Sequence, residues 1–275
     1  MSYQFRPDRM YRMPTHFGPS LGPRQGIEGR RYLNRDHPKQ TTIEATFEAK
    51  PAELAGLLPP MFEPLEPSRI TFAFTYIREI EWLAGRGYNT FGVRFPARFR
   101  GRQDDVSGEF LAVLWENRTE PIITGREELG FAKIYCELPD PQFDRDPLRC
   151  EARWEATTFA ALTLEGRRAG APATSAPPES VGLLHYKYIP ATEAWGKADV
   201  EYAVLTPAAV PNQRVERQER AANASMEFCS ASWEALPTLY NVVSVLAGLW
   251  IGPCVAAGVT ECRGSKDISD QRRLT

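Results

Sequence analysis

Short runs of alternating apolar and polar residues dominate the chain and constrain its fold more than any other feature. Eight runs have the two-residue period of half-buried β-strands. They lie at Thr42–Glu48, Ile70–Ile80, Asn89–Phe99, Phe110–Trp115, Phe131–Glu137, Arg153–Leu164, Leu183–Ile189 and Val200–Leu205. Only Pro51–Leu58 and Val242–Leu249 have helical character, and no β-α-β alternation is present. The pattern predicts an α+β, mostly β fold with antiparallel sheets, either open or closed.

The first 36 residues differ from the rest of the chain. They are rich in Arg, Pro and Gly and have no sustained period. We predict an extended arm over residues 1–36, lying on the body of the protein or on a neighbouring subunit. A single domain is expected over residues 37–275, since a chain of 275 residues can bury one full-sized core. Gly101–Ser107 and Gly166–Ser180 have the composition of loops.

Charge and hydropathy favour an enzyme of the cytoplasm over a protein that binds nucleic acid or membrane. The formal net charge is -2, and the arginines are spread along the chain and balanced by acids. The longest apolar stretch, around Val242–Ala257, is interrupted by Gly and Pro and is too short to span a bilayer. The N-terminus has no apolar signal-peptide core. We therefore expect a cytoplasmic protein with no nucleic-acid or membrane partner.

Familiar metal, cofactor and nucleophile motifs are absent from the sequence. Its five cysteines form no C-x-x-C pair, and only three histidines accompany them. This pattern indicates reduced thiols, with neither a zinc site nor a disulfide framework. The chain also lacks a G-x-S-x-G elbow, a Walker A loop and an H-E-x-x-H helix. We predict no cofactor and no metal.

The lysines are few enough to consider individually: Lys39, Lys50, Lys133, Lys187, Lys197 and Lys266. Four of these lie beside polar or turn residues and are expected to be solvated. Lys133 instead lies in Leu129–Tyr135, at the start of an apolar and aromatic strand. A desolvated amine loses its proton more easily and can then attack a carbonyl group. Lys187 is the rival nucleophile, and a strand-end lysine that reaches out to water is the common alternative for both.

A longer segment around Lys133 carries a family resemblance. Thr119–Lys133 (TEPIITGREELGFAK) resembles the signature of the acetoacetate decarboxylase family, in which an E-P…G-R-E segment runs into an aromatic residue and a Schiff-base lysine. Pro59…Glu63-Pro64-Leu65-Glu66 is similar to the family's P-x-P-L-E element, and Tyr186–Pro190 is similar to its K-x-I-P strand. The C-terminal Arg263–Arg272 resembles the end of bacterial relatives. The resemblance covers most of the chain from about residue 40.

The resemblance implies a fold, a mechanism and an assembly. The fold is an antiparallel sheet wrapped into a cone-like closed barrel, and Lys133 would form an imine with a carbonyl substrate. Acetoacetate decarboxylase is itself a known example of a lysine activated by its surroundings. The implied activity is that of a lyase acting on a keto acid, and family members form homo-oligomers. The alternative is a non-catalytic protein that keeps the fold and binds a small molecule.

Several site residues follow from aligning the chain with this family. The decarboxylase's second lysine is replaced by Ile134, and its two pocket acids align with Ala73 and Thr90. These losses favour aldol or dehydration chemistry over loss of CO2. An arginine that meets the substrate carboxylate would fall near Gln40, and Gln40 and Thr90 are therefore predicted to bind substrate.

Three aromatic residues complete the predicted site. Tyr88 is the candidate proton donor or acceptor, with packing at a sheet rim as the alternative. Phe131 and Trp115 are predicted to form walls of the cavity, with ordinary core packing as the alternative. The segment Gly125-Arg126-Glu127 is expected to be a turn that supports the site.

Overall fold

The computed structural model describes residues 4–172 and 179–275. Residues 173–178 of the predicted loop Gly166–Ser180 lie outside this described part. The strands are β1 (Lys39–Ala49), β2 (Phe62–Pro64), β3 (Arg69–Ile80), β4 (Arg86–Arg100), β5 (Asp105–Glu116), β6 (Lys133–Tyr135), β7 (Leu148–Trp154), β8 (Thr157–Glu165), β9 (Arg168–Ala169), β10 (Gly182–Pro190), β11 (Ala198–Pro207), β12 (Arg214–Arg220), β13 (Asn223–Phe228), β14 (Ile251–Arg263) and β15 (Arg272–Arg273). The helices are α1 (Pro51–Ala55), α2 (Thr119–Thr124) and α3 (Tyr240–Ala247), with short turns η1 (Thr15–Phe17), η2 (Ile27–Gly29), η3 (Glu81–Leu83) and η4 (Gly125–Leu129).

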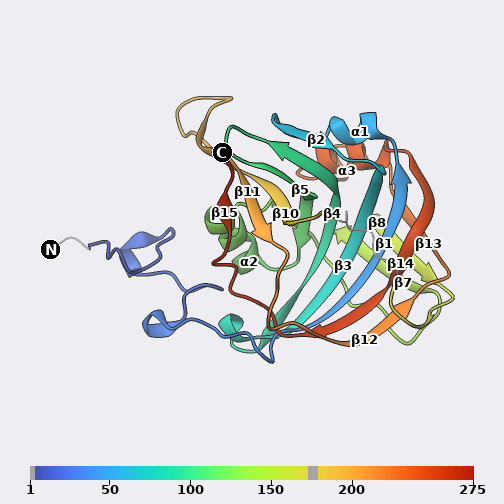
Figure 1. Cartoon of the computed structure of the whole chain (residues 1–275), viewed down its shortest axis with the longest axis horizontal. Coiled ribbons are helices and arrows are strands. Elements are labelled where there is room, and N and C mark those ends of the chain that lie inside the picture. Colours follow the sequence, from blue (N-terminus) through green and yellow to red (C-terminus); the bar gives the residue numbers. More distant parts are fainter. Residues whose placement is uncertain (1–3, 173–178) are drawn as a thin grey trace.

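Most strands belong to one large, curved sheet. Within the described residues its order is β15-β11-β10-β5-β4-β3-β1-β14-β12-β9, with β2 paired to β4 and β6 paired to β5. Neighbours are antiparallel except β10 with β5 and β5 with β6. The long strands β4, β3, β1 and β14 curve side by side across the molecule (Figure 1). The mostly β, largely antiparallel prediction is thus confirmed.

The closed-barrel prediction is not confirmed. In the described residues β15 and β9 end the pairing path at opposite sides, and no hydrogen-bonded ladder joins them. A second sheet of order β13-β8-β7 packs against the large one. The ring of Phe159 on β8 lies 5.5 Å from Trp115, and that of Phe228 on β13 lies 5.6 Å from Phe72. The main core therefore lies between two sheets.

Some sequence predictions of elements were wrong in detail. The predicted strand Arg153–Leu164 is a hairpin of β7 and β8, which turns at Glu155 with a φ of 51°. Strands β12 and β13 were missed because they carry many polar side chains and lie at the surface. Strand β14 was missed because its Gly and Pro residues obscure the alternation. The predicted turn at Gly125 is the π-helical turn η4, which continues α2.

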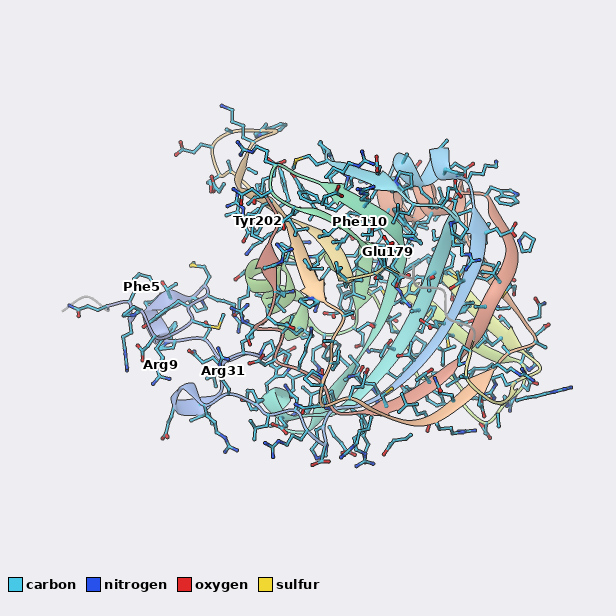
Figure 2. All side chains as sticks on the ribbon, viewed as in Figure 1. Phe5, Arg9, Arg31, Phe110, Glu179 and Tyr202 are labelled. Atoms are coloured by element: carbon cyan, nitrogen blue, oxygen red, sulfur yellow. The ribbon has the colours of Figure 1, made fainter. Side chains whose placement is uncertain are left out.

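The N-terminal segment is extended, as Figure 1 shows at the blue end of the chain. Its described residues before β1 form the turns η1 and η2 and an isolated bridge between Gly22 and Gln25. Figure 2 shows Phe5 and Arg9 on this arm, well away from the curved strands. In the described part of the chain, no helix is both long enough and apolar enough to cross a membrane.

Candidate active site

Three neighbouring strands align one row of side chains on the face of the large sheet opposite the main core. Gln40 on β1 pairs with Ile77 on β3, which in turn pairs with Tyr88 on β4. Because directly paired residues point to the same face, the three side chains form a continuous row. All three line a cavity of about 230 Å³. Gln40 and Tyr88, two of the residues predicted to form the site, thus line one cavity, and their roles stay predictions.

Lys133 reaches the same cavity from β6. Its side chain is 8% exposed, and its stem lies against Gly125 of η4. A methyl group added at Gly125 would lie 2.3 Å from Lys133 Cδ and 2.7 Å from Nζ. Arg126 holds the strand start by donating a hydrogen bond of 2.8 Å to the carbonyl oxygen of Lys133. A π-helical turn, which often marks a functional site, thus supplies the space for the lysine.

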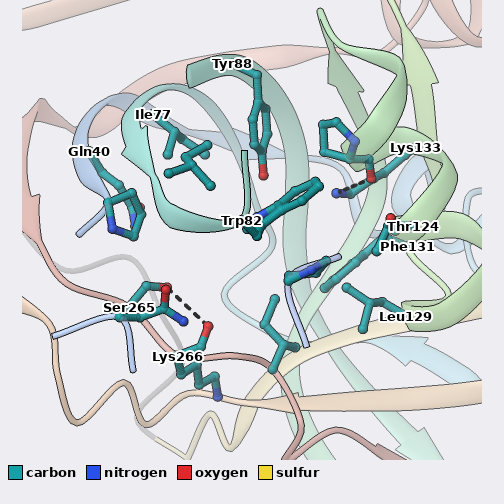
Figure 3. Close-up of a pocket in the computed structure, with 17 residues that line it drawn as sticks. Gln40, Ile77, Trp82, Tyr88, Thr124, Leu129, Phe131, Lys133, Ser265 and Lys266 are labelled. Carbon is teal, nitrogen blue, oxygen red and sulfur yellow. Dashed lines mark hydrogen bonds between the residues drawn. The ribbon is translucent and has the colours of Figure 1, made fainter. Parts of the chain in front are cut away.

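The Lys133 ammonium has two protein partners. Nζ lies 2.8 Å from Oε1 of Glu116 and donates a hydrogen bond of 3.1 Å to the carbonyl oxygen of Pro121 (Figure 3). The Glu116 side chain is only 1% exposed. Burial raises the pKa of Glu116 above its usual 4.5, while the charge of Lys133 opposes this rise. Glu116 was missed as a site residue because the predicted strand ended one residue earlier, at Trp115.

Apolar and aromatic side chains form most of the remaining wall. Trp82 on η3 lies between Tyr88 and Lys133 in Figure 3, and Phe131 and Leu129 lie on the lysine side. The Lys133 Nζ is 5.5 Å from the centre of the Phe131 ring. Such a cavity, apolar with a few converging polar groups, is typical of a small-molecule site. Trp82 was missed in the sequence because it lies in a hairpin turn without a strand period.

Both ends of the chain contribute to the cavity. Pro23 and Asn34 of the N-terminal arm line it together with Ser265 of the C-terminal segment. The two ends are joined where the amide of Ser265 donates a hydrogen bond of 2.8 Å to the carbonyl oxygen of Asn34. Nearer the start of the arm, Arg12 forms an ion pair of 3.2 Å with Glu128 of η4. The arm is therefore part of the site wall.

Tyr88 has a hydroxyl group suited to donating a hydrogen bond. Burial raises its pKa well above the ordinary value of 10, and the nearby charge of Glu116 adds to the rise. The phenol therefore keeps its proton near neutral pH. It can donate a hydrogen bond to a carbonyl oxygen in the cavity, and the phenolate form needed for a base is strongly disfavoured.

Two predicted site residues do not line the cavity. Trp115 is fully buried in the main core, where its ring stacks on Phe91 at a centroid distance of 5.1 Å. It precedes Glu116, and consecutive strand residues point to opposite faces. Thr90 shares the face of Tyr88 but lies two residues further along β4, opposite Glu116, and is only 8% exposed. The prediction that Trp115 forms a cavity wall was wrong, and Thr90 lies beneath the cavity.

The other lysines have different environments. Lys187 donates hydrogen bonds of 2.6 Å and 3.3 Å to the carbonyl oxygens of Glu127 and Glu128, which occupy its ammonium away from the cavity. Lys266, predicted to be solvated, has a side chain only 13% exposed and belongs to the cavity wall. Its ammonium is held 2.8 Å from Asp270. Of the two predicted rivals, Lys133 alone lines this cavity.

His185 is a buried support for the aromatic wall. Its Nδ1 donates to the carbonyl oxygen of Gly130 at 2.9 Å, so its Nε2 accepts from the Thr206 hydroxyl at 3.0 Å. Its ring stacks on Phe131 with centroids 4.4 Å apart. Burial is the main reason that the pKa of His185 falls from 6.5 to about 4.

This low pKa predicts a pH-dependent stability. Between pH 6.5 and pH 4 the unfolded chain binds a proton at His185 that the folded chain excludes, so stability falls as the pH falls. The expected loss of unfolding free energy is about 3 kcal/mol across this range. Denaturant unfolding at several pH values should show a shallower loss in His185→Gln. Identical pH slopes in both proteins would contradict the assignment.

The described residues contain no group of three or more His, Cys, Asp or Glu side chains placed to hold a metal ion. The polar groups of the residues that line the cavity are two lysine amines, a phenol, an indole N–H, amides and hydroxyls. This set can bind a small carbonyl compound, donate a hydrogen bond to its oxygen and attack its carbon.

Several solved structures with a similar fold are those of enzymes. In structure the chain is similar to the acetoacetate decarboxylase of Legionella pneumophila, with a TM-score of 0.63 and 19% identity over 92% of this chain and 94% of that one. It is similar to the enduracididine biosynthesis enzyme MppR complexed with pyruvate, with a TM-score of 0.61 and 12% identity over 91% and 94%. An acetoacetate decarboxylase-like enzyme from Sphingomonas wittichii RW1 gives a TM-score of 0.60 and 17% identity over 91% and 98%.

The sequence agrees with the structural likeness. The family model described as acetoacetate decarboxylase (ADC) matches residues 12–262. No curated protein sequence matches the chain. The fold, the cavity and these comparisons define a mostly β enzyme. The chain belongs to the acetoacetate decarboxylase family.

Proposed function

We propose that this enzyme is a lyase in which Lys133 forms a Schiff base with a small keto acid. The observation that carries the proposal is Lys133 on the wall of a cavity of about 230 Å³, paired with the buried carboxylate of Glu116 behind it. A buried ion pair contributes little net stability compared with apolar packing, so its presence beside a cavity favours a chemical role. An iminium at Lys133 withdraws electrons from the neighbouring carbon and so permits bond cleavage or formation there.

Aldol or dehydration chemistry is favoured over decarboxylation. The positions aligned with the decarboxylase's pocket acids carry Ala73 and Thr90, and the site's buried acid, Glu116, lies on β5. The solved relatives include both a decarboxylase and MppR bound to the condensation product of pyruvate and imidazole 4-carboxaldehyde. Tyr88 would hold the carbonyl oxygen of the substrate or of an aldehyde acceptor. The cavity volume limits the substrate to a few carbon atoms beyond the keto acid group.

Borohydride trapping tests the proposal. We expect pyruvate, acetoacetate or a close homologue plus borohydride to leave a reduced adduct on Lys133, found by intact mass and peptide mapping. CO2 release assayed in parallel separates decarboxylation from carbon–carbon bond formation. Lys187→Met is the matched control and should trap normally. An adduct on Lys187, or no adduct with any keto acid of the panel, would favour the alternative of a non-catalytic binding protein.

A further inference from the structure

A second row of polar side chains lies directly beneath the cavity. Thr42 on β1, Thr75 on β3 and Thr90 on β4 are paired in register, and β5 places Glu116 opposite Thr90. The hydroxyl oxygens of Thr42 and Thr75 are 3.1 Å apart. The row thus consists of three hydroxyl groups and one carboxylate, and the carboxylate lies at the end next to Lys133.

Glu116 can act on substrate only through the lysine. It is not among the residues that line the cavity, and its Oε1 contacts Lys133 Nζ at 2.8 Å. Its other oxygen, Oε2, is buried and has no hydrogen-bond partner among the described residues. A buried carboxylate oxygen without a partner is costly, and a proton placed there removes the charge that makes it so.

The contacts of Nζ show how the amine is freed. An ammonium has three N–H donors, and here two are directed at Glu116 Oε1 and the carbonyl oxygen of Pro121. The third direction is left for the cavity. If one proton moves to the carboxyl group and rests on Oε2, the remaining two N–H groups keep both acceptors. The lone pair then points into the cavity, where a carbonyl carbon can be attacked.

We propose that Glu116 is the proton carrier of Lys133 during imine formation, an inference that rests on the proposed function. The carboxylate first accepts a proton from the ammonium, giving a neutral amine and a carboxylic acid. The amine lone pair forms the C–N bond, the carbonyl π electrons move to oxygen, and the proton released from nitrogen gives the carbinolamine hydroxyl. Glu116 then returns its proton to the carbinolamine nitrogen, which it contacts, and this nitrogen passes a proton to the hydroxyl. The C–O bond breaks, the nitrogen lone pair forms the C=N bond, and water leaves. The restored carboxylate lies beside the positive iminium.

This cycle predicts a pH dependence set mainly by the carboxyl group. Protonation of Glu116 from solution leaves the ammonium without an acceptor, so imine formation slows on the acid side. Burial raises the pKa of Glu116, which places this acid limb above pH 4.5. The titratable or charged groups around Lys133 in the described residues include Tyr88 on β4, His185 on β10, Arg126 on η4 and, on the cavity wall, Lys266 with its partner Asp270. The pKa of Tyr88 lies well above 10, and the pKa of His185 is about 4.

The test measures the rate of borohydride trapping of Lys133 with pyruvate from pH 4.5 to pH 9. We expect Glu116→Gln to trap at least about 100-fold more slowly, since loss of general acid–base catalysis costs 10²–10⁴ in rate. Its acid limb should disappear, while the final amount of adduct stays that of the unsubstituted enzyme. Glu116→Asp should recover part of the rate, and formate should accelerate Glu116→Ala. The matched control is Glu109→Gln, which neutralises another largely buried carboxylate of β5, ion-paired to Arg94 and absent from the cavity lining, and which should trap at the rate of the unsubstituted enzyme.

The outcomes separate the two proposals. If the unsubstituted enzyme and Glu116→Gln trap the substrate on Lys133 with equal rates and equal pH profiles, the carrier role is overturned, while the proposed imine at Lys133 still stands. Absence of any Lys133 adduct in the unsubstituted enzyme would overturn both proposals. If Glu116→Gln fails to fold, two other measurements decide: the effect of formate on trapping by Glu116→Ala, and the trapping rate of Glu116→Asp. The carrier role is rejected if formate does not accelerate Glu116→Ala and if Glu116→Asp traps at the rate of the unsubstituted enzyme.

Discussion

Replacing Lys133 by Met is expected to abolish Schiff-base formation and to lower the unfolding free energy by about 3–5 kcal/mol. Methionine keeps most of the side-chain volume but removes the amine, so no adduct can form at this position. It also leaves the Glu116 carboxylate, only 1% exposed, without its ionic partner. Unfolding in denaturant and borohydride trapping measure the two effects separately.

The sign of the pH effect in this variant follows from Glu116. Its carboxyl group stays buried, so its pKa in the folded variant lies above the ordinary 4.5. The folded state then binds a proton more tightly than the unfolded state does. The variant should therefore be least destabilised below pH 4.5 and lose stability, relative to the parent, as the pH rises through the folded pKa.

A double variant provides the control for this prediction. Lys133→Met with Glu116→Gln removes both charges and should recover most of the lost stability, while turnover stays absent. If Lys133→Met turned over its substrate at the parental rate, Lys133 would be ruled out as the nucleophile. If Lys133→Met were as stable as the parent at pH 8, the ion pair between Lys133 and Glu116 would be weaker than its geometry indicates.

Gly125→Ala is expected to reduce the rate of imine formation by about 100-fold. Gly125 has a φ of −63°, which alanine adopts without strain, so the substitution does not act through the backbone. The new methyl group would lie 2.3–2.7 Å from Lys133 Cδ, Cε and Nζ and must displace the lysine side chain. A displacement of about 1 Å from the attacking geometry is enough for a loss of this size.

The control for this substitution is Gly248→Ala at the end of α3. There an added methyl group would find its nearest atoms at 3.5 Å, an ordinary contact, and activity should be unchanged. Trapping rates and unfolding curves of both variants are the measurements. An active Gly125→Ala enzyme with a full trapping rate would mean that the amine does not need the position seen in the structure.

Local sequence patterns predicted the parts of the site that lie on regular strands. The apolar strand start and the G-R-E…Lys segment led to Lys133 and its neighbour Phe131, and the alignment with the family led to Tyr88; all three line the cavity. The residues that were missed depend on long-range pairing. Glu116 becomes relevant only because β6 pairs in parallel with β5, and a single carboxylate at a strand end gives no sign of its partner.

Thr90 and Trp115 show the limit of position-by-position comparison. Aligning the chain with its family places Thr90 where an acid is expected, and the structure puts Glu116 directly across from it on the next strand. An alignment cannot show that a neighbouring strand supplies a carboxylate to the same face. Trp115 and Glu116 are consecutive in β5, so their side chains point to opposite faces of the sheet. Trp115 therefore lies in the core, and Glu116 lies beside Lys133.

The joining of both chain ends at the cavity has a consequence for the newly made protein. During synthesis the strand that carries Lys133 is complete long before Ser265 emerges to meet Asn34. Until then the wall formed by the C-terminal segment is missing and the N-terminal arm has no anchor there. The cavity around Lys133 is therefore completed only after Ser265 has been made and its segment has folded against the arm.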